Sequence, residues 1–135
     1  MAKFAALGTQ LLRGATEIAQ ITSISGPGLS LDTEDVTEHD GDGWEEVVAT
    51  ILRSGEVTFD IAYDPAAATH KYAAGGLLHD LVLRTATAYS IVFPDTAATT
   101  WTFSAFVTGF QPDMPVGDAL TASVTLKPTG TVTLA

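Results

Sequence analysis

Apolar and polar residues alternate along much of this chain, most regularly in its second half. Every second position is apolar in the segments 57–63, 89–93, 101–107 and 120–126. Side chains at alternate positions of a strand share one face, so each segment predicts a strand with one buried face. Weaker patterns predict strands at 9–13 and 18–24. We also expect a turn at 128–130 that leads into a short last strand at 131–134.

Two segments favour helix. Apolar residues at 44, 47, 48, 51 and 52 fit one helical face, and we predict a short helical turn there. A strand is the alternative, because Val, Thr and Ile favour strands. Residues 66–84 are rich in Ala and Leu and predict the main helix, with Thr69 as its N-cap. The expected fold is mainly β: a β-sandwich or barrel of two packed antiparallel sheets with one flanking α-helix, forming a single domain over residues 1–135.

Composition narrows the classes of function. The chain has 135 residues, enough for one domain with a real core, and no cysteine, which excludes disulfides and thiol chemistry. Sixteen acidic residues against six basic ones give a formal charge of −10. Phosphate binding needs Lys and Arg, so tight nucleic-acid binding is disfavoured. No apolar run is long enough to span a bilayer, and we expect no membrane partner.

A long acidic loop is predicted at about 32–46. Calcium is one ligand to consider, but an EF-hand register starting at Glu38 places Ala49 where a bidentate Glu is required. The histidines at 39, 70 and 79 lack the spacing of a zinc site. There is no Gly-x-Ser-x-Gly elbow and no phosphate-binding loop. We therefore expect no enzymatic activity, no metal and no cofactor, and interpret the loop as a surface arm that contacts a partner.

Three groups of short sequences occur in a fixed order. The first is Thr-x-His-Asp at 37–40, Gly-Trp-Glu-Glu at 43–46 and Leu-Arg-Ser-Gly-Glu-Val-Thr-Phe at 52–59. The second is Ile-Val-Phe-Pro-Asp at 91–95. The third is Phe-Val-Thr-Gly-Phe at 106–110, Pro-Val-Gly-Asp at 115–118 and Val-Thr-Leu-Lys-Pro-Thr-Gly at 124–130. As an ordered set, they resemble the major tail tube proteins of long-tailed, non-contractile bacteriophages.

This resemblance implies a structural subunit of the virion tail that is assembled in the host cytoplasm. Such subunits form hexameric rings, and the rings stack into a tube around the tape measure protein, with terminator and tip proteins at its ends and with DNA passing through unbound. The long loop is expected to reach a neighbouring subunit. The candidate contact residues are Asp35, Thr37, Glu38, His39, Asp40, Asp42, Trp44 and Arg53.

The acidic charge fits a conduit to which DNA does not adhere. Glu56 and Asp60 lie on the polar face of their predicted strand and are candidates for the lumen surface; an ordinary solvent-facing position explains them equally well. Two other functions remain open. One is a tube or ring protein of a contractile tail or secretion apparatus. The other is a β-sandwich binding or adhesin module, although the aromatic residues alternate as core residues do.

Overall fold

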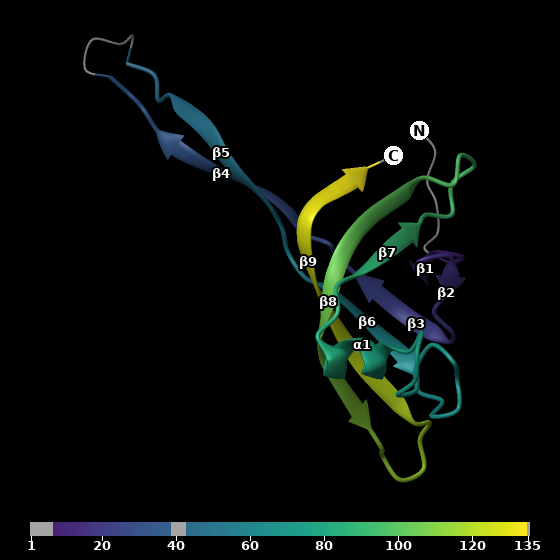
Figure 1. Cartoon of the computed structure of the whole chain (residues 1–135). Coiled ribbons are helices and arrows are strands. Elements are labelled where there is room, and N and C mark those ends of the chain that lie inside the picture. Colours follow the sequence, from purple (N-terminus) through teal and green to yellow (C-terminus); the bar gives the residue numbers. More distant parts are fainter. Residues whose placement is uncertain (1–6, 39–42, 135) are drawn as a thin grey trace.

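The computed structural model describes residues 7–38 and 43–134. Seven strands form one antiparallel sheet in the order β2-β1-β7-β8-β9-β6-β3 (Figure 1). The strands are β1 (Gln10–Arg13), β2 (Thr16–Glu17), β3 (Ile21–Ser25), β6 (Val57–Ala62), β7 (Thr87–Val92), β8 (Thr100–Asp113) and β9 (Thr121–Leu134). The prediction of a mainly β fold with one helix is confirmed.

The long central strands β8 and β9 curve, and the sheet curls with them (Figure 1). Their pairing shifts register twice, between Thr102 and Ser104 and between Val107 and Gly109. Such bulges bend a strand and increase its twist. Strands from both ends of the sheet therefore share one core. Its buried apolar residues are Leu11, Ile18, Val57, Phe59, Ile61, Leu77, Tyr89, Ile91, Phe103, Ala105, Val107, Ala122, Val124 and Leu126.

The end of β9 differs from the prediction of a turn followed by a separate strand. Residues 128–130 lie inside β9, where Pro128 pairs with Ala105 and Thr133 pairs with Thr102. Pro128 and Thr129 pair regularly with β8, and a bulge follows them, starting at Gly130 with a φ of 77°. β8 is long enough to pair with β9 on both sides of the bulge, so the chain continues along the sheet rather than reversing.

A second, two-stranded sheet projects from the first (Figure 1). It consists of β4 (Leu29–Asp35) and β5 (Val47–Ser54), and we call it the ribbon. The helical turn predicted at 44–52 is wrong, and the strand alternative is correct. The β-branched residues of β5 favour a strand, and β4 supplies the hydrogen-bonding partner. The predicted acidic loop is also shorter than expected, because its residues 32–35 belong to β4.

Helix α1 (Leu77–Leu83) is much shorter than the predicted 66–84. Its N-cap is Gly76, and the residues before it form turns. A Cβ atom at Gly76 would lie 1.8 Å from the carbonyl oxygen of Lys71, so only glycine allows this close approach. The predicted cap, Thr69, has another role: its Oγ1 accepts a hydrogen bond of 3.1 Å from the backbone N–H of Ala19.

A buried cluster of polar side chains joins α1 to the sheet. Arg13 of β1 donates to both oxygens of Asp80 through Nε and Nη2, at 2.6 and 2.7 Å. The hydroxyl of Tyr89 on β7 donates to the same carboxylate at 2.9 Å. Burial alone would raise the pKa of Asp80, but the hydrogen bonds from Arg13 and Tyr89 and the charge of Arg13 outweigh it and lower this pKa. The ion pair therefore stays charged near neutral pH.

His70 is buried, which the sequence pattern did not predict. Its Nε2 donates to the carbonyl oxygen of Ala19 at 2.7 Å, and its Nδ1 accepts from the backbone N–H of Asp64 at 3.2 Å. Both ring nitrogens thus satisfy buried backbone groups of loops that flank the sheet. This histidine, considered above only as a zinc ligand, is part of the structural framework.

Candidate subunit-contact surface

The ribbon has one apolar and one charged face. Residues paired across two antiparallel strands share a face, and β4 pairs Leu31 with Leu52, Thr33 with Ala49 and Asp35 with Val47. Side chains alternate along β4, so Leu29 joins this set. We call this side the apolar face for its leucines and Val47, although Thr33 and Asp35 also lie on it. The leucines are solvent-exposed, with Leu52 at 80%. Exposed apolar side chains gathered on a projecting element are typical of a protein-binding surface.

The opposite face carries charge. Alternation along β4 places Asp32 and Glu34 on this side, and Arg53 joins them because it pairs with Ser30. Nε of Arg53 donates to Asp32 at 2.7 Å, and both side chains are largely exposed. Exposed ion pairs contribute about 0–1 kcal/mol, so this one adds little to stability.

Hydrogen bonds order the ribbon toward its tip. Thr37 donates to Oδ1 of Asp35 through its backbone N–H at 2.9 Å and through its hydroxyl at 2.6 Å. These bonds lower the pKa of Asp35. The backbone N–H of Glu46 donates in turn to Oγ1 of Thr37 at 2.9 Å. Two of the predicted contact residues thus shape the end of the ribbon.

The other predicted contact residues are distributed along the ribbon. Glu38 is exposed next to the tip, and Trp44 is 77% exposed in the segment that leads into β5. Arg53 lies at the far end of the ribbon, opposite Ser30. His39, Asp40 and Asp42 lie outside the described residues.

Close backbone contacts hold the base of the ribbon against the sheet. The N–H of Gly55 donates to the carbonyl oxygen of Gly28 at 2.7 Å. A Cβ atom at Gly26, whose φ is 96°, would lie 2.3 Å from the carbonyl oxygen of Glu56. Glycine is required at Gly26 both for the positive φ and for this close approach. The ribbon therefore leaves the sheet from a tightly packed crossing.

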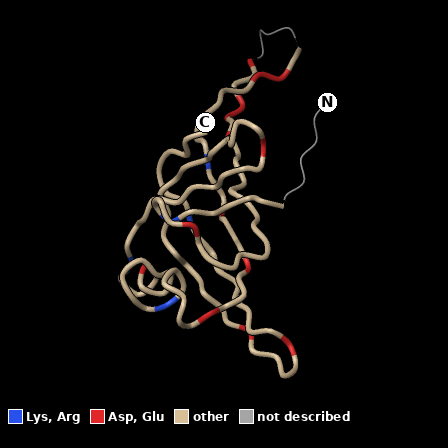
Figure 2. The backbone as a smooth tube through the Cα atoms, turned by 90° about the vertical axis from the view of Figure 1, so that its right-hand side faces the viewer, with Lys and Arg blue, Asp and Glu red and all other residues tan. Residues whose placement is uncertain are grey.

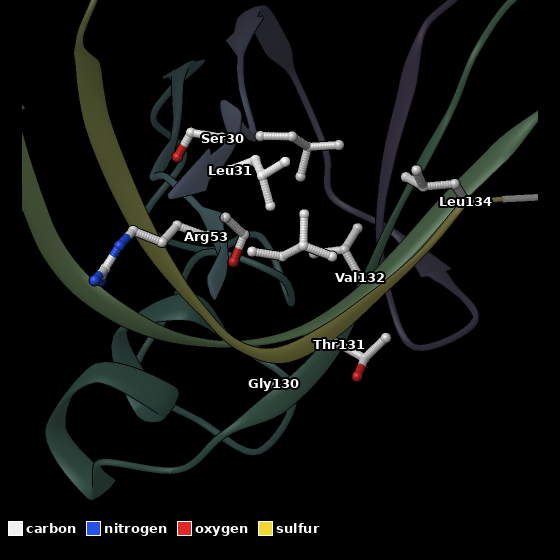
Figure 3. Close-up of a pocket in the computed structure, with 10 residues that line it drawn as sticks. Ser30, Leu31, Arg53, Gly130, Thr131, Val132 and Leu134 are labelled. Carbon is white, nitrogen blue, oxygen red and sulfur yellow. The ribbon is translucent and has the colours of Figure 1, made fainter. Parts of the chain in front are cut away.

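A pocket of about 660 Å³ lies beside this crossing (Figure 3). Leucine side chains of the ribbon form one wall, and the last residues of β9 form the other. Its lining consists of Leu29, Ser30, Leu31, Leu52, Arg53, Ser54, Gly130, Thr131, Val132 and Leu134. The pocket opens between the ribbon and the end of the sheet.

The two predicted lumen residues lie near each other in sequence but differ in surroundings. Asp60 is exposed on β6 and accepts hydrogen bonds from the hydroxyls of Ser23 and Ser123, at 3.0 and 2.8 Å. Glu56 is exposed just before β6 begins. Acidic residues also occur along the ribbon and in the loop at the opposite end of the molecule (Figure 2).

The leucines of the ribbon are the surface residues that sequence reasoning missed. The signal was present: Leu29 and Leu31 alternate with polar residues, and the next apolar run is rich in β-branched residues. Among residues 7–38 and 43–134, the structure contains no cluster of three or more His, Asp or Glu side chains that could hold a metal ion. In the same ranges, no helix is long and apolar enough to cross a membrane.

Several solved structures share this fold. One is a chain in the sheath/tube terminator of the extracellular contractile injection system PVC in its extended state, with a TM-score of 0.74 and 20% identity, covering 100% of this chain and 98% of that one. A chain in the virion of a native gene transfer agent has a TM-score of 0.78 and 11% identity, and the match covers 98% of this chain and 99% of that one. A chain of the anti-feeding prophage tube-terminating cap has a TM-score of 0.69 and 16% identity, and the match covers 100% of this chain and 95% of that one. A comparison with curated proteins found no match.

The curled sheet, helix α1 and projecting ribbon thus form a fold that chains of these phage-tail-like assemblies share. The family model described as lambda phage tail tube protein matches residues 10–135, and the chain belongs to this family. The predicted resemblance to tail tube proteins is confirmed. Members of this family are structural components of the virion tail, and the family is not one of enzymes.

Proposed function

We propose that this protein is the tail tube subunit of a non-contractile phage, forming hexameric rings that stack into a conduit for DNA. The observation that carries this proposal is the ribbon, whose apolar face stays largely exposed among the described residues of its own chain. An isolated two-stranded hairpin is at most marginally stable in water. A neighbouring subunit that covers the apolar face would both order the ribbon and remove its leucines from solvent.

The surroundings of the tube follow from the same proposal. The tape measure protein occupies the lumen during assembly, terminator and tip proteins close the ends, and DNA later passes through without specific contacts. Each subunit contributes a formal charge of −10, which opposes contact with phosphate groups. Hexameric symmetry is supported by analogy, since fold relatives occur in a baseplate described as 6-fold symmetrised and in a tail with C6 symmetry.

A tube inside a contractile sheath is the second candidate. It is favoured by a fold relative in the sheath-tube complex of a contractile injection system, at 20% identity and a TM-score of 0.68. Electron microscopy of the intact particle distinguishes the two, because only the contractile tail has a sheath around the tube. The family match argues against the third possibility, a β-sandwich binding or adhesin module.

Assembly itself is the first test. We expect monomers in dilute solution and rings or tubes in concentrated solution, because association of one chain follows mass action. Negative-stain microscopy and light scattering across a concentration series measure this. A monodisperse monomer at millimolar concentration contradicts the proposal.

The lumen assignment has its own test. Glu56→Lys tubes should retain a short fluorescent DNA duplex at low salt and release it as salt rises. Each contact between Lys and a phosphate group releases a counterion from the DNA, so binding weakens when the salt concentration increases. Wild-type tubes should retain none. The matched control is Glu17→Lys, which makes the same charge change on the exposed strand β2. Equal retention by both variants would contradict a lumen position for Glu56.

A further inference from the structure

A second exposed apolar feature lies at the end of the molecule opposite the ribbon. The loop after β8 carries Met114 and Val116, which are 71% and 103% exposed. In Figure 1 this loop is at the bottom, while the ribbon projects at the top. The same chain therefore exposes apolar side chains at both ends, and its own loop is far from its own ribbon.

The pocket beside the ribbon matches this loop in size and character. At about 660 Å³ it falls within the range of about 300–1,000 Å³ that holds a small ligand. Figure 3 shows Leu31, Val132 and Leu134 around it. Met is a flexible side chain that fills irregular apolar spaces, and Val adds a compact branched one.

Stiffness also favours this loop as the occupant. Pro115 between the two apolar residues restricts the loop, which lowers the entropy lost when it is immobilised.

We propose that Met114 and Val116 of one copy insert into the ribbon pocket of a second copy in the adjacent ring. The inference rests on the proposed tube function and adds the contact that stacks the rings. The contact joins two different surfaces of one chain, so it is heterologous. A heterologous contact whose rotation does not close generates an open filament. Contacts within a ring close the ring, whereas this contact extends the tube.

Cross-linking tests the contact directly, because the chain has no native cysteine. In a Leu52→Cys/Val116→Cys variant, oxidation of assembled tubes should give a ladder of dimers, trimers and longer chains on a non-reducing gel. A disulfide forms only when the two Cα atoms approach to about 4.4–6.8 Å. The control is Leu52→Cys/Val82→Cys, which moves the second thiol to an exposed position on α1 and should give no ladder.

A second variant tests the inference without cross-linking. Val116→Asp places an unpaired carboxylate in the apolar pocket, so it should raise the concentration needed for tubes at least about 30-fold while leaving separate rings intact. Normal tube formation by Val116→Asp overturns the inference. So does the absence of a ladder after oxidation of Leu52→Cys/Val116→Cys tubes. A ladder from unstacked rings overturns it too, since it assigns the pocket to a neighbour in the same ring. Failure of the wild-type chain to assemble would instead overturn the proposed function.

Discussion

Val47→Asp subunits should remain unassembled at concentrations where Val48→Asp subunits still form tubes. The two residues are adjacent on β5 and similarly exposed, at 51% and 46%, but they face opposite sides of the ribbon. On the apolar face, the substitution removes about 2 kcal/mol of burial and adds the cost of desolvating a charge. A total of about 3 kcal/mol raises the concentration required for assembly roughly 100-fold.

Sedimentation of assembled material across a concentration series measures this difference. Both variants should unfold at the same temperature as the wild type, since the ribbon projects from the core. If the two substitutions impair assembly equally, the apolar face is not the contact surface. If neither does, the ribbon is not an assembly element.

Asp80→Asn should lower the free energy of unfolding by about 3 kcal/mol. The substitution leaves the partly buried Arg13 without its carboxylate and weakens the hydrogen bond from Tyr89. The matched control is Asp32→Asn, which breaks the exposed pair with Arg53 and should cost less than about 1 kcal/mol. Chemical denaturation of the two variants measures both values. Similar costs would show that burial of the Asp80 pair is not important.

The same cluster predicts the response to acid. The pKa of Asp80 is lower in the folded chain than its ordinary value of 3.8, so the folded state holds its proton less tightly than the unfolded state. The contribution of Asp80 to the free energy of unfolding is complete above that ordinary pKa. It is lost as pH falls through the lower pKa of the folded state. Wild type should therefore lose more stability than Asp80→Asn below about pH 4.

Local pattern was enough to predict much of the sheet. Strand β6 was expected from alternating Val57, Phe59 and Ile61, and all three are buried. Helix and strand were harder to separate at 44–52, where the apolar spacing fits a helical face but the β-branched residues favour a strand. The deciding factor is the partner strand β4, which lies earlier in the chain. Gly76, just before the helix, likewise approaches the carbonyl group of Lys71 so closely that a Cβ atom would clash, which no periodicity reveals.

Sequence alone determined the class of fold, the excess of acidic charge and the tail tube family. These properties depend on the identity and order of residues, which are explicit in the chain. Tertiary structure alone decided which apolar residues remain exposed on the ribbon and which polar ones are buried. Arg13 and Asp80 are 67 residues apart, and only folding of the sheet brings them together. The ribbon pocket, too, exists only because the end of β9 lies beside β4 and β5.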